Sequence, residues 1–120
     1  LEESPFVFEK ELENKNVLEA IEAGNLGFTL VINEEKELKG LISNADVRKG
    51  LLRNLEDFNA MDPLSLMNPN PVQVEEDMTV EEMMNLIKKC KFQISYLPVV
   101  NKNKQAVGIV TFVNLIKGEL

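Results

Sequence analysis

The sequence predicts an α/β (α+β) fold of two tandem β-α-β-β-α repeats, packed against each other with pseudo-twofold symmetry. An internal repeat is the main observation, because residues 28–33 and 38–43 line up without gaps with residues 96–101 and 106–111. Helical patterns also precede and follow both copies. Since an α/β unit of this size cannot cover its apolar sheet face alone, we expect the two units to pack together.

Each repeat contains a predicted strand hairpin. In both copies an apolar run with β-branched residues leads into a polar turn and a second apolar run, which is typical of a buried hairpin. The turns cover residues 33–37 and 101–105, and both begin with asparagine. Short extended segments at residues 6–8 and 71–74 supply one more strand for each copy.

An amphipathic helix is predicted before each hairpin. Apolar residues recur at spacings of three and four over residues 17–23 and over residues 80–89. The first copy is five residues shorter between this helix and its hairpin. Both helices are expected to begin with a capping box, in which a polar N-cap residue and an acid three residues later exchange hydrogen bonds. The predicted pairs are Asn16 with Glu19, and Thr79 with Glu82.

A second helical pattern follows each hairpin, beginning at Val47 and at Val113. Between the copies, prolines at several positions interrupt any helix and indicate turns. The predicted organisation is a first repeat over residues 1–54, a connector over residues 55–67 and a second repeat over residues 68–120.

Composition narrows the possible functions. The 120 residues carry a net charge of -7, and no segment gathers enough Lys and Arg to neutralise several phosphates, so we expect no nucleic-acid partner. A single cysteine, Cys90, and the absence of histidine leave no metal site and no internal disulfide to predict. No apolar run approaches the ~20 residues that span a bilayer, and the first residues lack the pattern of a signal peptide. We therefore expect a cytoplasmic protein without membrane insertion.

The junctions between hairpin and second helix carry a family resemblance. They read Gly40-Leu-Ile-Ser-Asn-Ala-Asp46 and Gly108-Ile-Val-Thr-Phe-Val-Asn114. With the repeated strands and helices, they resemble the CBS domain pair, or Bateman module, over nearly the whole chain. Residues 43–49 are also similar to CBS pairs attached to arabinose-5-phosphate isomerases or found beside sugar nucleotidyltransferases, although Asn44 and Ala45 differ from that pattern. Any sugar-phosphate chemistry is expected to belong to a parent or partner domain.

The resemblance implies two half-sites for a ligand. In that family the hydroxyl and the acid of the junction face a cleft between the repeats, where the acid holds ribose hydroxyls. Carried over, Ser43 and Asp46 form one half-site, and Thr111 and Asn114 form the other. A helix N-terminus favours a phosphate, and a carboxylate accepts two hydrogen bonds from a diol. The same pairs are also expected as plain helix caps, so both interpretations stay open.

Five other residues are candidate ligand contacts. Arg48 would match two phosphate oxygens with its guanidinium, or lie solvated at the surface. Phe28 and Tyr96 occupy matching positions at the starts of the hairpins, where they would flank a base or serve as core. Pro71 and Val72 begin the short predicted strand of the second copy. They too would either contact the ligand or have only a structural role.

The function expected from the resemblance is regulatory. The chain would sense a nucleotide-like molecule, either AMP, ADP or ATP or a nucleotide sugar, in the cleft and modulate an attached or associated enzyme or transporter. No cofactor is required. Catalysis by the chain itself is not expected, because the sequence has no P-loop, nucleophile elbow or recognisable carboxylate pair. The alternative is a structural dimerisation module without a ligand, since CBS pairs commonly form homodimers through their helices.

Overall fold

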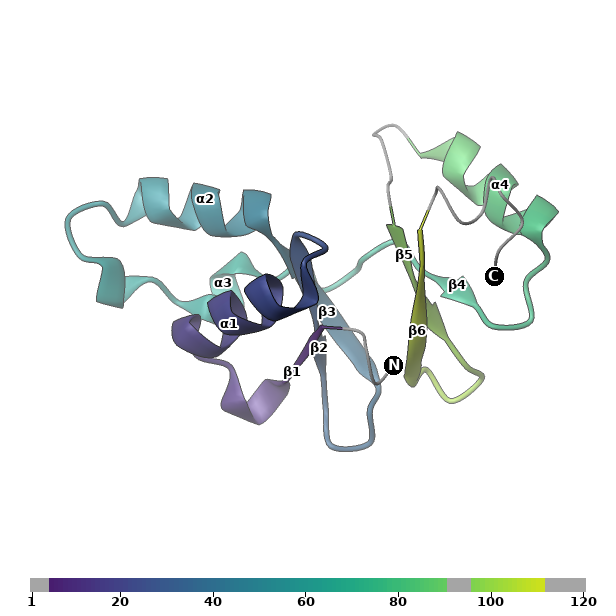
Figure 1. Cartoon of the computed structure of the whole chain (residues 1–120), viewed down its shortest axis with the longest axis horizontal. Helices are drawn as coiled ribbons and strands as arrows, with labels where there is room; N and C mark the ends of the chain where they lie inside the picture. Colours follow the sequence, from purple (N-terminus) through teal and green to yellow (C-terminus); the bar gives the residue numbers. More distant parts are fainter. Residues whose placement is uncertain (1–4, 91–95, 112–120) are drawn as a thin grey trace. The chain divides into compact units, whose positions relative to one another are not determined.

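The computed structural model describes residues 5–90 and 96–111, and the chain divides into two compact units (Figure 1). One unit spans Glu2–Pro71 and the other Val72–Leu120. Each contains a sheet of three strands, with three α-helices described in the first unit and one in the second, which confirms the mixed α/β (α+β) fold class. No helix in the described part of the chain combines the length and apolarity needed to cross a membrane.

The first unit is a sheet in the order β1-β2-β3 with three helices. Its elements are β1 (Phe6–Phe8), α1 (Asn14–Gly24), β2 (Phe28–Ile32), β3 (Leu38–Ser43), α2 (Asn44–Arg53) and α3 (Pro63–Leu66), with 3-10 turns at Glu9–Glu11 and Phe58–Ala60. Strand β1 runs parallel to β2, and β2 runs antiparallel to β3. The predicted order of strand, helix, hairpin and helix is therefore confirmed in this unit.

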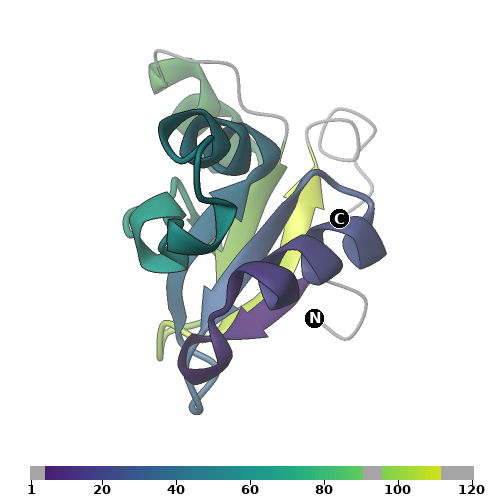
Figure 2. The ribbon, with the colours of Figure 1, turned by 90° about the vertical axis from the view of Figure 1, so that its left-hand side faces the viewer.

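All three helices lie on one face of this sheet, as Figure 2 shows from their side. Their core joins residues from every layer, namely Val17, Ile21, Val31, Ile42, Val47, Met61 and Leu66. On the opposite face of the strands, Phe28, Leu30, Ile32 and Leu41 are also buried. Burial on both faces explains why these strands are continuous apolar runs rather than alternating ones.

The segment after α2 also packs on the first unit. Met61 and Leu66, which fall in the predicted connector, are buried in its core. Farther along, Leu41 and Asn68 exchange backbone hydrogen bonds of 3.0 and 2.8 Å, so the chain pairs with the edge of β3. Gly40 permits this approach, because a Cβ there would lie 2.4 Å from Cγ of Met67.

The second unit repeats the topology with β4 (Val74–Glu75), α4 (Val80–Lys89), β5 (Tyr96–Val100) and β6 (Ala106–Thr111). Strand β4 runs parallel to β5, and β5 runs antiparallel to β6. Val74, Met83 and Leu97 form the centre of its core. The helix predicted from Val113 lies outside the described residues.

The two hairpins share one turn structure. In each, the side-chain oxygen of the leading asparagine accepts the backbone N–H four residues on, from Glu37 at 2.8 Å and from Gln105 at 3.0 Å. The asparagine amide also donates to the side chain of that same residue, at 2.9 Å in both copies. Lys36 and Lys104 take left-handed φ angles of 67° and 64°. The repeat therefore extends from the sequence to individual hydrogen bonds.

One of the two predicted capping boxes is confirmed and the other is wrong. Thr79 and Glu82 exchange the expected hydrogen bonds at the start of α4. Helix α1, however, starts at Asn14, so Asn16 lies inside the helix. The Asn16 side chain instead donates to the carbonyl of Glu11 at 2.7 Å, because the preceding 3-10 turn presents that oxygen.

Candidate functional site

Ser43 and Asp46 meet at the N-terminus of α2. Ser43 is the N-cap, and its Oγ accepts the backbone N–H of Asp46 at 3.2 Å. In return, Oδ2 of Asp46 accepts the backbone N–H of Ser43 at 2.9 Å and its hydroxyl at 3.0 Å. Both bonds use Oδ2, and Oδ1 accepts none from the described residues. The carboxylate is thus held in place by the cap while one oxygen stays available.

Asp46 lines an open surface cavity of about 200 Å³ within the first unit, and the other polar residues that line it are exposed. The lining residues are Asp46, Lys49, Arg53, Ser65, Leu66, Met67 and Asn68. Asp46, Lys49 and Arg53 follow one another at spacings of three and four on α2, so they share one helix face. The other wall is α3 and the segment that pairs with β3. A polar cavity with a carboxylate and two cations can hold hydroxyl and anionic groups together.

Sequence reasoning did not single out the other polar residues of this cavity. Lys49 and Arg53 had a detectable signal, because they lie three and seven positions after Asp46 on a predicted helix. Ser65 and Asn68 had none, since they join the cavity only through the packing of the connector on the first unit.

Phe28 and Arg48 lie near this half-site but outside the cavity lining. Phe28 pairs in register with Ser43 across the hairpin, and its side chain is 0% exposed, as in a core residue. Arg48 is exposed on α2. Arg48 lies two positions after Asp46 and one before Lys49. Side chains at these spacings do not share a helix face, so Arg48 points away from the face that carries Asp46 and Lys49. Their roles as ligand contacts stay predictions.

The second half-site is only partly described. Thr111 ends β6 and pairs in register with Tyr96, and both are partly buried. Asn114, the predicted partner of Thr111, lies outside the described residues. Pro71 is the last residue of the first unit, whereas Val72 packs against the core of the second. Within single units the structure brings together Ser43 with Asp46, and Tyr96 with Thr111.

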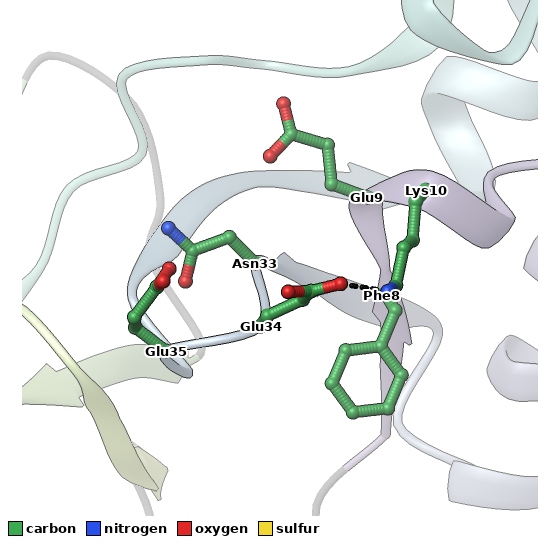
Figure 3. Close-up of a pocket in the computed structure, with 6 residues that line it drawn as sticks. All are labelled: Phe8, Glu9, Lys10, Asn33, Glu34 and Glu35. Atoms are coloured by element: carbon green, nitrogen blue, oxygen red, sulfur yellow. Dashed lines mark ion pairs between the residues drawn. The ribbon is translucent and has the colours of Figure 1, made fainter.

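A different cavity, of about 400 Å³, lies where β1 and β2 end (Figure 3). Its lining residues are Phe8, Glu9, Lys10, Asn33, Glu34 and Glu35, and Lys10 forms an ion pair with Glu34. Three carboxylates against one cation make this surface unfavourable for a phosphate. Across residues 5–90 and 96–111, no group of three His, Cys, Asp or Glu side chains is arranged to hold a metal ion.

Comparison with known proteins assigns the family. The CBS domain family model matches residues 64–119. Uncharacterized protein YlbB of Bacillus subtilis is 34% identical over 109 residues, covering 87% of this chain and 70% of that protein. The chain belongs to the CBS domain family. Within CBS proteins, arabinose 5-phosphate isomerase KdsD of Francisella tularensis is 34% identical over 120 residues, and the aligned region is 98% of this chain but 35% of the isomerase.

Solved CBS structures share the fold. The CBS domain pair of MJ0100, in complex with 5'-methylthioadenosine and S-adenosyl-L-methionine, has a TM-score of 0.75 at 23% identity, covering 96% of this chain and 91% of that one. CBSX2 in complex with AMP has a TM-score of 0.74 at 22% identity, covering 98% and 87%. The cytosolic domain of the Mg2+ channel MgtE in complex with ATP has a TM-score of 0.72 at 28% identity, covering 98% and 45%.

Proposed function

We propose that this chain is a regulatory CBS module that binds a nucleotide-like ligand through Asp46. The observation that carries the proposal is the fixed carboxylate at the start of α2, whose Oδ1 accepts no hydrogen bond from the described residues, on a residue that lines a polar surface cavity. An oxygen held in this way can accept a hydrogen bond from a ribose hydroxyl without first losing side-chain freedom. Ser43 supports the carboxylate and supplies the helix N-terminus.

The relatives and this geometry support the proposed ligand class. CBS structures have been solved with AMP, with ATP and with S-adenosyl-L-methionine and 5'-methylthioadenosine, all of which contain an adenosine ribose. A nucleotide sugar presents the same diol. The similarity to arabinose 5-phosphate isomerase is the reason to include nucleotide sugars among the proposed ligands. Tyr96, Thr111 and Asn114, with Pro71 and Val72, form the remaining contacts that we propose for the base and the second half-site. No cofactor is part of the proposal.

The output of the module would be a change in an attached or associated enzyme or transporter, in the cytoplasm, where adenine nucleotides are found. A ligand shifts such an equilibrium only by its differential affinity for two states, commonly about 1 to 3 kcal/mol. We therefore expect modest regulation and no turnover by the chain itself.

A thermal-shift screen of the purified chain tests the ligand class. The panel contains AMP, ADP, ATP, S-adenosyl-L-methionine and UDP-glucose, each at several concentrations. A ligand at a hundred times its dissociation constant should stabilise the fold by about 2.7 kcal/mol, which raises Tm by several degrees. A dose-dependent rise with one class supports the proposal. The same Tm with every compound would contradict it.

A second candidate function, dimerisation, rests on exposed apolar residues of the first unit. Leu52 and Leu55 are 65% and 76% exposed and line one surface depression at the end of α2. Leu64, on α3, is 57% exposed. Exposed apolar side chains that lie together, as Leu52 and Leu55 do, are typical of protein interfaces. This surface supports a homodimer formed through the helices, either alongside ligand binding or in place of it.

Charge on this surface should separate the copies. We expect the wild-type chain to have the mass of a dimer in light scattering after size exclusion, and the double variant Leu52→Glu, Leu55→Glu to have the mass of a monomer. Leu26→Glu is the control, because Leu26 is also exposed but lies between α1 and β2. A monomeric wild-type protein, or a dimer that survives both glutamates, would rule out this interface.

A further inference from the structure

We propose that the outer edge of β1 is a docking site for an extended segment of a partner protein, in which basic and apolar residues alternate. The segment adds a strand beside Phe6–Phe8. This surface shares no residue with the cavity beside Asp46. The inference therefore goes beyond the ligand site, and only the identity of the partner as the regulated enzyme or transporter rests on the proposed function.

The backbone of β1 has one unpaired side. Strand β1 is the edge strand of its sheet, in the order β1-β2-β3. The N–H of Leu30 donates to the carbonyl of Pro5 at 3.0 Å, and Phe6 pairs in register with Leu30. In a parallel ladder this directs the backbone groups of Val7 toward β2, and those of Phe6, with the N–H of Phe8, away from it. These outward groups have no hydrogen-bond partner among the described residues, so the edge can pair with a further strand.

Phe6 and Phe8 give one face of this edge an apolar surface. They are two residues apart and so share a face of the strand. Their rings meet edge to face, with centroids 5.5 Å apart. Val7 lies between them on the helix side, because its partner Val31 belongs to the core under the helices. The rings therefore lie on the other face, where both are half-buried, and apolar side chains of an added strand can pack against them.

The repeat shows that the sheet does not require this aromatic pair. Val74 of β4 is the counterpart of Val7, since both pair in parallel with the middle strand of their sheet at equivalent positions. The residues on either side of Val74 are Gln73 and Glu75, and both are exposed. The order of the three strands is nevertheless the same in both units. The aromatic edge is thus particular to the first unit and not a condition of the fold.

Carboxylates gather beside the same edge. A cavity of about 180 Å³ between β1 and α1 is lined by Glu11 and Glu19. Glu19 is 3.8 Å from Lys15, but an exposed pair of this kind is weak. The cavity of about 400 Å³ at the end of β1 (Figure 3) carries three more carboxylates and one cation, namely Glu9, Glu34, Glu35 and Lys10. Both cavities favour a basic side chain.

The two faces together determine the pattern of the occupant. Side chains of an added strand alternate between the faces of the sheet. Those on the helix side would meet Glu11 and Glu19, and those on the other side would meet the aromatic rings. Lys or Arg at every second position, with apolar residues between, satisfies both. A second copy of this chain fits less well, because pairing β1 with β1 brings two sets of carboxylates together and each chain carries a net charge of -7.

Peptide binding measured by fluorescence polarisation tests this pattern. The probe is a labelled peptide of four Val-Lys repeats, and four Val-Glu repeats are the control peptide. We expect the wild-type chain to bind only the basic probe. The double variant Glu11→Gln, Glu19→Gln should bind it at least about fivefold more weakly, because two exposed charge pairs are lost. The charge-matched control Glu76→Gln, Glu81→Gln changes exposed acids of the second unit and should keep wild-type affinity.

Amide hydrogen exchange then distinguishes strand addition from simple charge attraction. The bound probe should slow exchange at the outward N–H groups of Phe6 and Phe8, whereas Val7, already directed toward β2, serves as the internal reference. Binding that leaves both phenylalanine amides unchanged would overturn strand addition.

The remaining outcomes also decide against the proposal. Absence of probe binding would reject the docking site, and equal losses in the two double variants would mean that the chain attracts the peptide through its net charge alone. Slow exchange at Phe6 and Phe8 that appears without peptide and increases with protein concentration would assign the edge to a second copy. No measurement here contains a nucleotide, so failure of the docking site leaves the proposed ligand site at Asp46 unaffected.

Discussion

Replacement of Asp46 by alanine is expected to abolish the thermal stabilisation of the chain by its nucleotide ligand. The substitution removes Oδ1, the oxygen that we assign to a ribose hydroxyl, together with the negative charge that strengthens the bond. At a ligand concentration a hundred times the wild-type dissociation constant, about 2.7 kcal/mol of stabilisation should disappear. Thermal melts with and without ligand measure the difference directly.

The same substitution also breaks the cap of α2, so a matched control is needed. Glu82 has the identical position in the capping box of α4, where it pairs with Thr79. Loss of either cap should lower the stability of the unliganded chain by ~1 kcal/mol. Glu82→Ala should nevertheless keep the full ligand-dependent rise in Tm. If Asp46→Ala keeps it as well, Asp46 is only a cap and the site assignment is wrong.

Gly40→Ala is expected to destabilise the first unit by ~1 to 3 kcal/mol, the range found for overpacked sites. A Cβ at this position would lie 2.4 Å from Cγ of Met67 and 2.8 Å from the carbonyl oxygen of Asn68. The methionine side chain can turn away, but the Asn68 carbonyl is held by the backbone N–H of Leu41 at 3.0 Å. Urea unfolding of the purified variant measures the loss.

The repeat itself supplies the control for this prediction. Gly108 is the counterpart of Gly40 in β6, and no described atom lies within 4 Å of a Cβ built there. Gly108→Ala should leave stability unchanged, or raise it by up to ~1 kcal/mol through a less flexible unfolded chain. Equal losses in both variants would mean that strand propensity, rather than the packing of the connector, decides the result.

The hairpins could be predicted because their determinants are local. Each turn depends on an asparagine and the residue four positions later, which the sequence places side by side. The start of α1 could not be predicted in the same way. Asn16 has a suitable partner for a capping box, but the carbonyl of Glu11 competes for its side chain. That competition depends on a 3-10 turn that has no clear sequence pattern.

The candidate site shows the same division between local and distant determinants. Asp46 and Ser43 could be named because the cap and the family pattern lie within four consecutive residues. The opposite wall of the cavity that Asp46 lines could not be predicted in this way. Leu66 reaches it from a proline-rich segment without helical periodicity, and only burial in the core of the first unit reveals its position.

The pairing of Asn68 with Leu41 fixes a point of the first unit only a few residues before the second unit begins. Asn68 is fixed to the edge of β3, and Val72 already packs against the core of the second unit. Four peptide links of ~3.8 Å each separate the two anchors. Asn68 is also a wall of the cavity beside Asp46. A ligand that displaces this wall would therefore move a residue that is only four peptide links from the core of the second unit.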